Sequence, residues 1–254
     1  MVARRTGEGI KSVVMVSQVE ITDLVYAIEG KEILSGLNLS LAERRIGIVG
    51  RNGSGKSTFA RIVSGLVEPT SGRVSVNGLD LPKDRRAAIR EVGILFQNPE
   101  HQIIFPTVGE EIAFGLEQQG LKKTAAVREM KAVLEQFGLT HWREAHIATL
   151  SQGQKHLVCL MAISAMNPKL LVLDEPFAGL DIPTKAQMNR YLSLYEGSLL
   201  HITHDTADLD GYDTVVWIDQ GIVRQSGARE TVMTSYLAAM HSLGEDDDIA
   251  FLSR

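Results

Sequence analysis

The loop from Gly50 to Ser57 reads Gly-Arg-Asn-Gly-Ser-Gly-Lys-Ser and has the spacing G-x-x-x-x-G-K-[ST]. Glycines at these positions let the backbone curl so that successive N–H groups converge on phosphate oxygens, at the positive end of a following helix. The Lys56 ammonium is placed to reach the β- and γ-phosphates of a nucleotide, and the Ser57 hydroxyl to ligate Mg²⁺. The expected phosphate contacts are therefore Asn52, Gly53, Ser54, Gly55, Lys56, Ser57 and Thr58.

Two adjacent carboxylates supply the second half of such a site. The apolar run Leu170–Leu173 is followed directly by Asp174 and Glu175. Alone, this pattern is equally typical of an ordinary strand that ends in polar residues. Together with the phosphate loop it indicates a nucleotide site, in which Asp174 holds Mg²⁺ through its water shell and Glu175 acts as general base on the attacking water.

A third feature is the start of the helix that leads to these carboxylates. It begins with Leu150-Ser-Gln-Gly-Gln154. Ser151 at the N-cap would leave free N–H donors and a hydroxyl at the helix end, which is a second possible phosphate-binding end. By itself this sequence is also what an ordinary capped helix needs.

The hydrophobic pattern predicts a fold that brings these residues together. Strands are expected at 13–25, 33–41, 45–49, 73–76, 170–173, 199–203, 214–218 and 222–225, with a hairpin turn at 29–31. Helices are expected at 56–64 and at 183–195, the latter capped by Asp181, and further helices capped by Thr107, Thr124 and Ser151 fill a mostly helical segment at 97–167. Since strands that alternate with helices form βαβ crossovers, we predict an α/β fold: a P-loop NTPase core with a largely parallel sheet, an N-terminal antiparallel β subdomain and a helical subdomain.

Composition narrows the classes of protein. The 254 residues carry 26 Lys and Arg against 31 Asp and Glu, a formal net charge of −5, so a nucleic-acid partner is not expected. No apolar run reaches the roughly 18 residues of a membrane span. The single cysteine, Cys159, cannot form an internal disulfide and fits a reducing compartment, and no apolar core follows Arg4 and Arg5 as a secretory signal would require. We therefore expect a cytosolic protein.

Taken together, these motifs resemble the ATP-binding cassette (ABC) ATPases, over about residues 17–236. We expect a loose extension at 1–16 and an acidic tail at 237–254. The signature of the family normally reads Leu-Ser-Gly-Gly-Gln, and here Gln152 stands at the third position, while Leu157 stands where a basic residue is often found. The resemblance implies a Mg²⁺-dependent ATPase with ATP and Mg²⁺ as its ligands.

The resemblance also assigns roles to single residues. It makes Gln97 the loop glutamine that senses Mg²⁺ and the attacking water, and His204 the switch histidine that contacts the γ-phosphate. Tyr26 becomes the aromatic residue that stacks on adenine, and Asp181 part of a loop that crosses a dimer interface. Without the resemblance, Tyr26 is more simply a half-buried strand residue, and His204 equally a structural histidine; we expect His201 to be structural.

In this family two cassettes enclose two ATP molecules, and each signature helix completes the site of the other subunit. By resemblance, Ser151, Gly153 and Gln154 would then bind the γ-phosphate across the interface. One chain carries every element, so a homodimer is expected, with a paralogous heterodimer as the alternative. Loss of the γ-phosphate on hydrolysis would weaken the contact between the subunits.

The segment from Phe96 to Gly115 closely resembles the glutamine-loop region of energy-coupling-factor (ECF) ATPases, which drive bacterial uptake of vitamins and of cobalt or nickel ions. In that family it forms a groove for a coupling helix of the transmembrane subunit. Glu110 and Glu111 would offer charges to a basic partner helix, or would serve equally well as first-turn helix stabilisers. The pattern is nearest to the biotin and cobalt branches, and the short segment after the last expected helix favours biotin.

The resemblance thus implies the motor subunit of an ECF importer, at the cytoplasmic face of the membrane, with a second ATPase subunit, a transmembrane scaffold and a substrate-binding membrane subunit. The main alternative is a soluble cassette ATPase of iron–sulfur cluster assembly, against which the ECF-like segment argues. A DNA-repair cassette would need a long coiled coil between Lys56 and Ser151. A P-loop kinase would leave the signature and His204 unexplained, and a purely structural binding protein is expected to lack Glu175.

Overall fold

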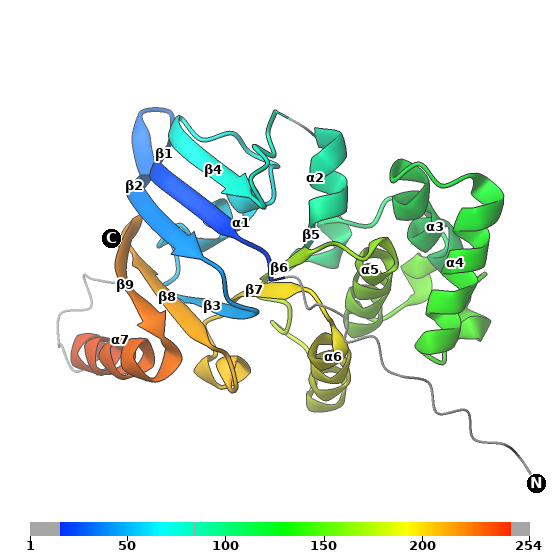
Figure 1. The fold of residues 1–254 in the computed structure, drawn as a ribbon. Helices are drawn as coiled ribbons and strands as arrows, with labels where there is room; N and C mark the ends of the chain where they lie inside the picture. Colours follow the sequence, from blue (N-terminus) through cyan, green and yellow to red (C-terminus); the bar gives the residue numbers. More distant parts are fainter. Residues whose placement is uncertain (1–15, 84, 245–254) are drawn as a thin grey trace, which may run out of the picture.

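The computed structural model describes residues 16–83 and 85–244, which form two sheets with helices around them (Figure 1). The smaller sheet is antiparallel, in the order β2-β1-β4, with β1 at Val19–Ile28, β2 at Lys31–Leu41 and β4 at Ser71–Val76. The turn between β1 and β2 places Glu29 and Gly30 at φ 49° and 80°, a left-handed pair typical of tight hairpins. The expected hairpin at 29–31 is thus confirmed.

The larger sheet has six strands in the order β5-β6-β7-β3-β8-β9. The strands are β3 (Arg45–Val49), β5 (Val92–Leu95), β6 (Leu170–Asp174), β7 (Ser198–Ile202), β8 (Thr214–Asp219) and β9 (Ile222–Ala228). All neighbours pair in parallel except β9, which is antiparallel to β8. The predicted α/β fold, with a mostly parallel core sheet and an antiparallel three-stranded subdomain, is confirmed.

Helices cover the sheets and extend from one side. They are α1 (Lys56–Val63), α2 (Arg85–Glu91), α3 (Val108–Gln118), α4 (Lys123–Gln136), α5 (Gln152–Met166), α6 (Ile182–Leu194) and α7 (Arg229–Gly244). In Figure 1 the antiparallel sheet lies at one end of the molecule and α3 and α4 at the other, with α5 between them and the core sheet. No helix in the described part of the chain is long and apolar enough to cross a bilayer.

Alternate residues of the central strands bury opposite faces. In β6, Leu170 and Val172 join a core cluster shared with the antiparallel sheet and α1, whereas Leu171 and Leu173 join a cluster shared with the helices α3 to α6. A third cluster packs α7 against β8. This period-2 division is why the run Leu170–Leu173 is apolar at every position.

Three helix starts occur as predicted. The side chains of Thr107, Ser151 and Asp181 accept hydrogen bonds from backbone N–H groups in the first turns of α3, α5 and α6. The predicted Thr124 cap is wrong: the N-cap of α4 is Lys122, which makes no side-chain cap bond, so Thr124 is already inside the helix.

Other boundaries also differ from expectation. The strand expected from residue 13 begins at Val19, and neither α2 nor β5 was expected. The last helix, α7, continues to Gly244 and so includes the first residues of the expected tail at 237–254. Residues 1–15 of the expected extension and 245–254 of the tail lie outside the described residues.

Candidate functional site

The parallel strands deliver the candidate residues to one edge of the core sheet. The carboxyl end of β3 leads into the phosphate loop, that of β5 to Gln97, that of β6 to Asp174 and Glu175, and that of β7 to His204. Carboxyl ends of parallel strands share one edge, which is where ligands bind in open α/β sheets. The topology therefore explains how residues more than 100 positions apart meet.

Glycine is required at two points of the phosphate loop. A Cβ on Gly50 would lie 2.0 Å from the backbone oxygen of Ile218, and one on Gly55 would lie 2.6 Å from the side chain of Leu34. Gly55 is also the N-cap of α1, at φ 99°. The loop can therefore curl against β8 and β2 only because it lacks side chains there, and this aims the N-terminus of α1 at the cavity described below.

Lys56 is folded back over this loop. Its Nζ donates to the backbone oxygens of Gly50 and Arg51, each at 2.8 Å, and the side chain is only 6% exposed. Burial lowers the pKa of Lys56, while Glu175 and Asp174 act in the opposite direction. The loop thus holds a partly desolvated ammonium whose charge is available to a phosphate group.

Ser57 and Asp174 join the two halves of the site. Ser57 Oγ donates to Asp174 Oδ1 at 3.0 Å, and Asp174 is 4% exposed. Burial raises the pKa of Asp174, partly offset by the Ser57 hydrogen bond. Two oxygen donors fit a Mg²⁺ ion that keeps several waters and takes its other ligands from substrate phosphates. The described residues hold no cluster of three or more His, Cys, Asp or Glu side chains that could hold a metal ion.

Glu175 is the centre of a second group. With its proton on Nδ1, His204 donates to Glu175 Oε2 at 3.0 Å, and Gln97 Nε2 donates to the same oxygen at 3.4 Å. Glu175 has φ 49°, in the left-handed region that non-glycine residues seldom adopt, and its N–H donates to Ile202 O in β7. This sharp turn after β6 directs the carboxylate toward Gln97 and His204.

Except for the buried Asp174, these groups line one cavity of about 620 Å³, a size within the usual range for small-molecule sites. Nine residues expected from the sequence line it: Asn52, Gly53, Gly55, Lys56, Ser57, Thr58, Gln97, Glu175 and His204. Ile33 at the start of β2 also lines it and was not expected. The sequence places Ile33 in the antiparallel subdomain but does not predict its contact with the phosphate loop. That contact depends on how the two sheets pack.

The other expected residues lie outside this lining. Ser54 is buried in the loop, and Tyr26 is half-buried against the core cluster shared by the two sheets. At the start of α5, Gln154 N donates to Ser151 Oγ and Ser151 N donates to Gln154 Oε1, which is a reciprocal capping box. Gly153 lies beside Thr184 of α6, and Asp181 accepts from Thr184 N at 3.0 Å. Ser151, Gln154 and Asp181 are exposed, away from the cavity of their own chain.

Polar contacts of His201 and Lys185 lie next to the segment that carries His204. His201 is fully buried, with Nδ1 at 2.9 Å from the Tyr212 hydroxyl, and burial lowers its pKa to about 3. Lys185 of α6 pairs with Asp205, the residue after His204, and with Asp208. His201 is therefore structural, as predicted, whereas the Lys185 pairs link α6 to the His204 segment and were not expected.

The two glutamates at the start of α3 differ in what they contact. Glu111 is 6% exposed, and its Oε2 accepts from the N–H groups of Ile104 and Phe105 at 2.9 and 2.8 Å. Glu110 is exposed, and its Oε2 accepts from Thr107 Oγ1 at 2.6 Å. The prediction that Glu111 offers its charge to a partner is wrong, because its buried carboxylate accepts hydrogen bonds from the backbone of its own chain. For the exposed Glu110 both roles stay predictions.

Comparisons with known proteins agree with this geometry. The family model described as "ABC transporter" matches residues 34–178. The biotin transport ATP-binding protein BioM of Rhodobacter capsulatus is 48% identical over 215 residues, covering 85% of this chain and 92% of that protein. The cobalt import ATP-binding protein CbiO of Syntrophus aciditrophicus is 35% identical, covering 85% and 80%. The structure of cbiO1 from Clostridium perfringens, part of the transporter complex cbiONQ, superposes with a TM-score of 0.74 at 25% identity, covering 94% of this chain and 99% of that one.

Proposed function

The chain belongs to the ABC transporter family and is an ATPase of the ECF type, and from this we propose that it drives a bacterial importer for a vitamin, with biotin favoured over cobalt or nickel ions. The observation that carries the choice of cargo is the 48% identity to a protein named for biotin transport, against 35% for one named for cobalt import. The choice of cargo thus rests on relatedness to proteins named for transport.

The reaction is ATP + water → ADP + phosphate, and the chain contributes mainly positioning and charge. The N–H groups of the loop and the Lys56 ammonium bind the β- and γ-phosphates. Ser57 and Asp174 would hold Mg²⁺, which when bound would neutralise charge on the phosphate oxygens. Glu175 takes the proton of the attacking water as the bond from the γ-phosphorus to the ADP oxygen breaks.

Gln97 and His204 complete this arrangement. Both side chains converge on Glu175 Oε2 in the structure, so both are within reach of a water held by that carboxylate. Gln97 would orient the water, and His204 would contact the γ-phosphate. Supporting this assignment is the position of all three side chains in the lining of the same cavity as Lys56 and Ser57.

The residues at the starts of α5 and α6 are assigned to the contact with a second ATPase subunit. Ser151, Gly153 and Gln154 would contact the γ-phosphate of the ATP bound by that subunit, and Asp181 would lie at the interface between the two subunits. Ser151, Gln154 and Asp181 are exposed, and all four residues lie outside the cavity lining of their own chain, which favours this role. Since one chain carries both halves, a homodimer is the proposed assembly, with a paralogous partner as the alternative.

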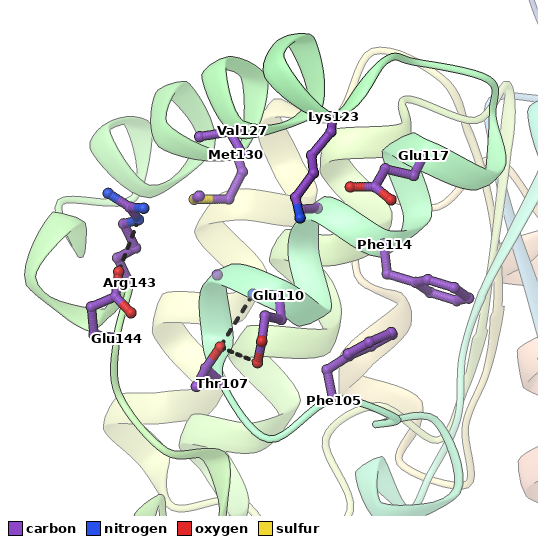
Figure 2. Close-up of a pocket in the computed structure, with 12 residues that line it drawn as sticks. Phe105, Thr107, Glu110, Phe114, Glu117, Lys123, Val127, Met130, Arg143 and Glu144 are labelled. Carbon is purple, nitrogen blue, oxygen red and sulfur yellow. Dashed lines mark hydrogen bonds and ion pairs between the residues drawn. The ribbon is translucent and has the colours of Figure 1, made fainter.

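A second surface is proposed as the contact with the transmembrane scaffold. A cavity of about 420 Å³ lies between α3, α4 and the segments that flank them. Figure 2 shows Phe105 and Phe114 side by side at one end, with ring centroids 4.9 Å apart, and Arg143 at the other end. Half-buried aromatic rings with charged groups beside them suit an amphipathic helix of a partner. This surface follows Gln97 in the chain, so a change at the γ-phosphate can reach it.

Purification of the tagged chain from detergent-solubilised cells of its own source tests the proposal. We expect a transmembrane scaffold and a substrate-binding membrane protein to co-purify, and cells that express this complex to take up labelled biotin rather than labelled cobalt. A Glu175→Gln variant is the matched control, because the complex should assemble without uptake. Recovery of soluble scaffold proteins only would contradict the importer and favour iron–sulfur cluster assembly.

A further inference from the structure

Two successive residues of α5 hold the segment that follows β5. His156 Nε2 lies 2.9 Å from the backbone oxygen of Gln97. Lys155 Nζ forms an ion pair with Glu100, in the short helical turn Pro99–His101. The signature helix thus contacts the Gln97 segment at two points, one buried and one at the surface.

The buried contact acts on the backbone of a proposed catalytic residue. His156 is 0% exposed, and its other ring nitrogen, Nδ1, lies 3.1 Å from the oxygen of Gln152. With its proton on Nε2, the neutral ring donates to Gln97 O, and the imidazolium donates to both oxygens. The side chain of the same Gln97 reaches Glu175 Oε2, so the imidazole fixes the carbonyl of the residue whose amide faces the general base.

We propose that His156 is a positioning residue for ATP hydrolysis, which holds Gln97 in place through the hydrogen bond to its carbonyl, with the Lys155–Glu100 pair as a second attachment. The proposal rests on the role of Gln97 given above. Because α5 begins at Gln152, directly after its cap Ser151, the Gln97 segment is attached within the first two turns of the helix whose N-terminus is assigned to the second nucleotide site. Among the described residues, a buried hydrogen bond and an ion pair therefore connect the Gln97 segment with the start of α5.

Two substitutions separate the hydrogen bond from the volume of the ring. His156→Gln keeps an N–H donor at the same reach, whereas His156→Leu keeps the bulk without a donor. His141→Leu, at an exposed histidine outside both proposed sites, is the matched control. Each change is made in the wild type and in a Gln97→Ala background, with kcat and KM for MgATP and the melting temperature as readouts.

We expect His156→Leu to lower kcat by about 10- to 100-fold, with KM changed less than about threefold. The His156→Gln variant should keep most of the wild-type kcat. In the Gln97→Ala background, the same leucine should cost less than about twofold, since the residue it positions is already absent. A merely structural histidine would instead give losses that multiply in the double variant, which would overturn the proposal. If His156→Leu is fully active while Gln97→Ala is defective, only the role of His156 is overturned. If Gln97→Ala is itself fully active, the proposed role of Gln97 is overturned as well.

A buried leucine can prevent folding, so the surface pair gives an independent test. Lys155→Met and Glu100→Gln each remove the ion pair at partly exposed positions, and each should lower kcat about two- to threefold. The kcat of the double variant should be no lower than that of either single variant. In the Gln97→Ala background, neither substitution should lower kcat further. Additive losses, or unchanged kcat in both single variants, would show that the contact does not position Gln97.

Discussion

Glu175 and His204 meet through one carboxylate oxygen, with His204 Nδ1 3.0 Å from Glu175 Oε2. Gln97 Nε2 faces the same oxygen, so both donors lie on one side of the carboxylate. The other oxygen, Oε1, makes neither of these contacts, so the proposed mechanism assigns to it the proton of the attacking water. Gln97 and His204 together therefore orient the carboxylate of Glu175.

The first prediction concerns this base. Glu175→Gln keeps the size and the hydrogen-bonding capacity of the side chain but removes its basicity, so kcat should fall by about 10² or more while ATP binding is retained. ATP should then hold the protein as a dimer on size-exclusion chromatography. Glu196→Gln, which changes the same residue type outside the cavity, is the control. A monomer with ATP, or normal hydrolysis, would contradict the assignment.

The second prediction is that the buried carboxylate of Asp174 lowers the free energy of unfolding at neutral pH. Its pKa is raised by burial, so the folded state binds the proton more tightly than the unfolded state, whose pKa is near 3.8. Protonated Asp174 therefore stabilises the fold below about pH 3.8. This contribution is lost as the pH rises through the higher pKa of the folded state. At pH 7, Asp174→Asn should therefore raise the free energy of unfolding by about 1 kcal/mol, measured by urea titration, while MgATP hydrolysis is lost. Lower stability would show that the carboxylate is better paired than its burial indicates.

The third prediction concerns His201, whose pKa is lowered to about 3 by burial. Between about pH 6.5 and 3 the unfolded chain binds a proton at this position and the folded chain does not, so stability falls as pH falls through this window. His201→Gln stays neutral and can still accept from Tyr212. Its free energy of unfolding should vary less with pH, by up to about 1.4 kcal/mol per pH unit. Parallel curves for the variant and the wild type would place the titrating group elsewhere.

The fourth prediction compares the two glutamates at the start of α3. Glu111→Ala leaves the N–H groups of Ile104 and Phe105 without their acceptor, which should cost about 2–3 kcal/mol of stability. Glu110→Ala removes an exposed contact with Thr107 and should cost less than about 1 kcal/mol. Urea unfolding of both variants gives the comparison. Equal costs would mean that the buried carboxylate does not hold this loop.

The sequence predicted the parts of the site that are local in the chain. The phosphate loop, the carboxylates after an apolar strand and the caps Thr107, Ser151 and Asp181 each need only a few neighbouring residues. By contrast, α2 and β5 are short, at seven and four residues, and show too little periodicity to be recognised. Contacts such as that of His156 with Gln97 depend on the packing of elements far apart in sequence, which no local pattern encodes.

Tyr26 shows why the face of a strand can be unpredictable. The register between β1 and β2 shifts three times between Ile21 and Ala27, on both sides of Tyr26. Each shift breaks the alternation that assigns residues to one face or the other. Sequence alternation could therefore not decide whether the ring faces the core or the nucleotide, and in the structure it packs partly against the core.

The shared helical cluster bears on how the molecule unfolds. Leu171 and Leu173 of β6 lie in one apolar cluster with residues of α3, α4 and α5. Melting of those helices would expose a face of the core sheet, so the helical segment and the sheet should lose structure in one cooperative transition. The helical segment is therefore a lobe of one folding unit, and excising it would leave the remaining chain prone to aggregate.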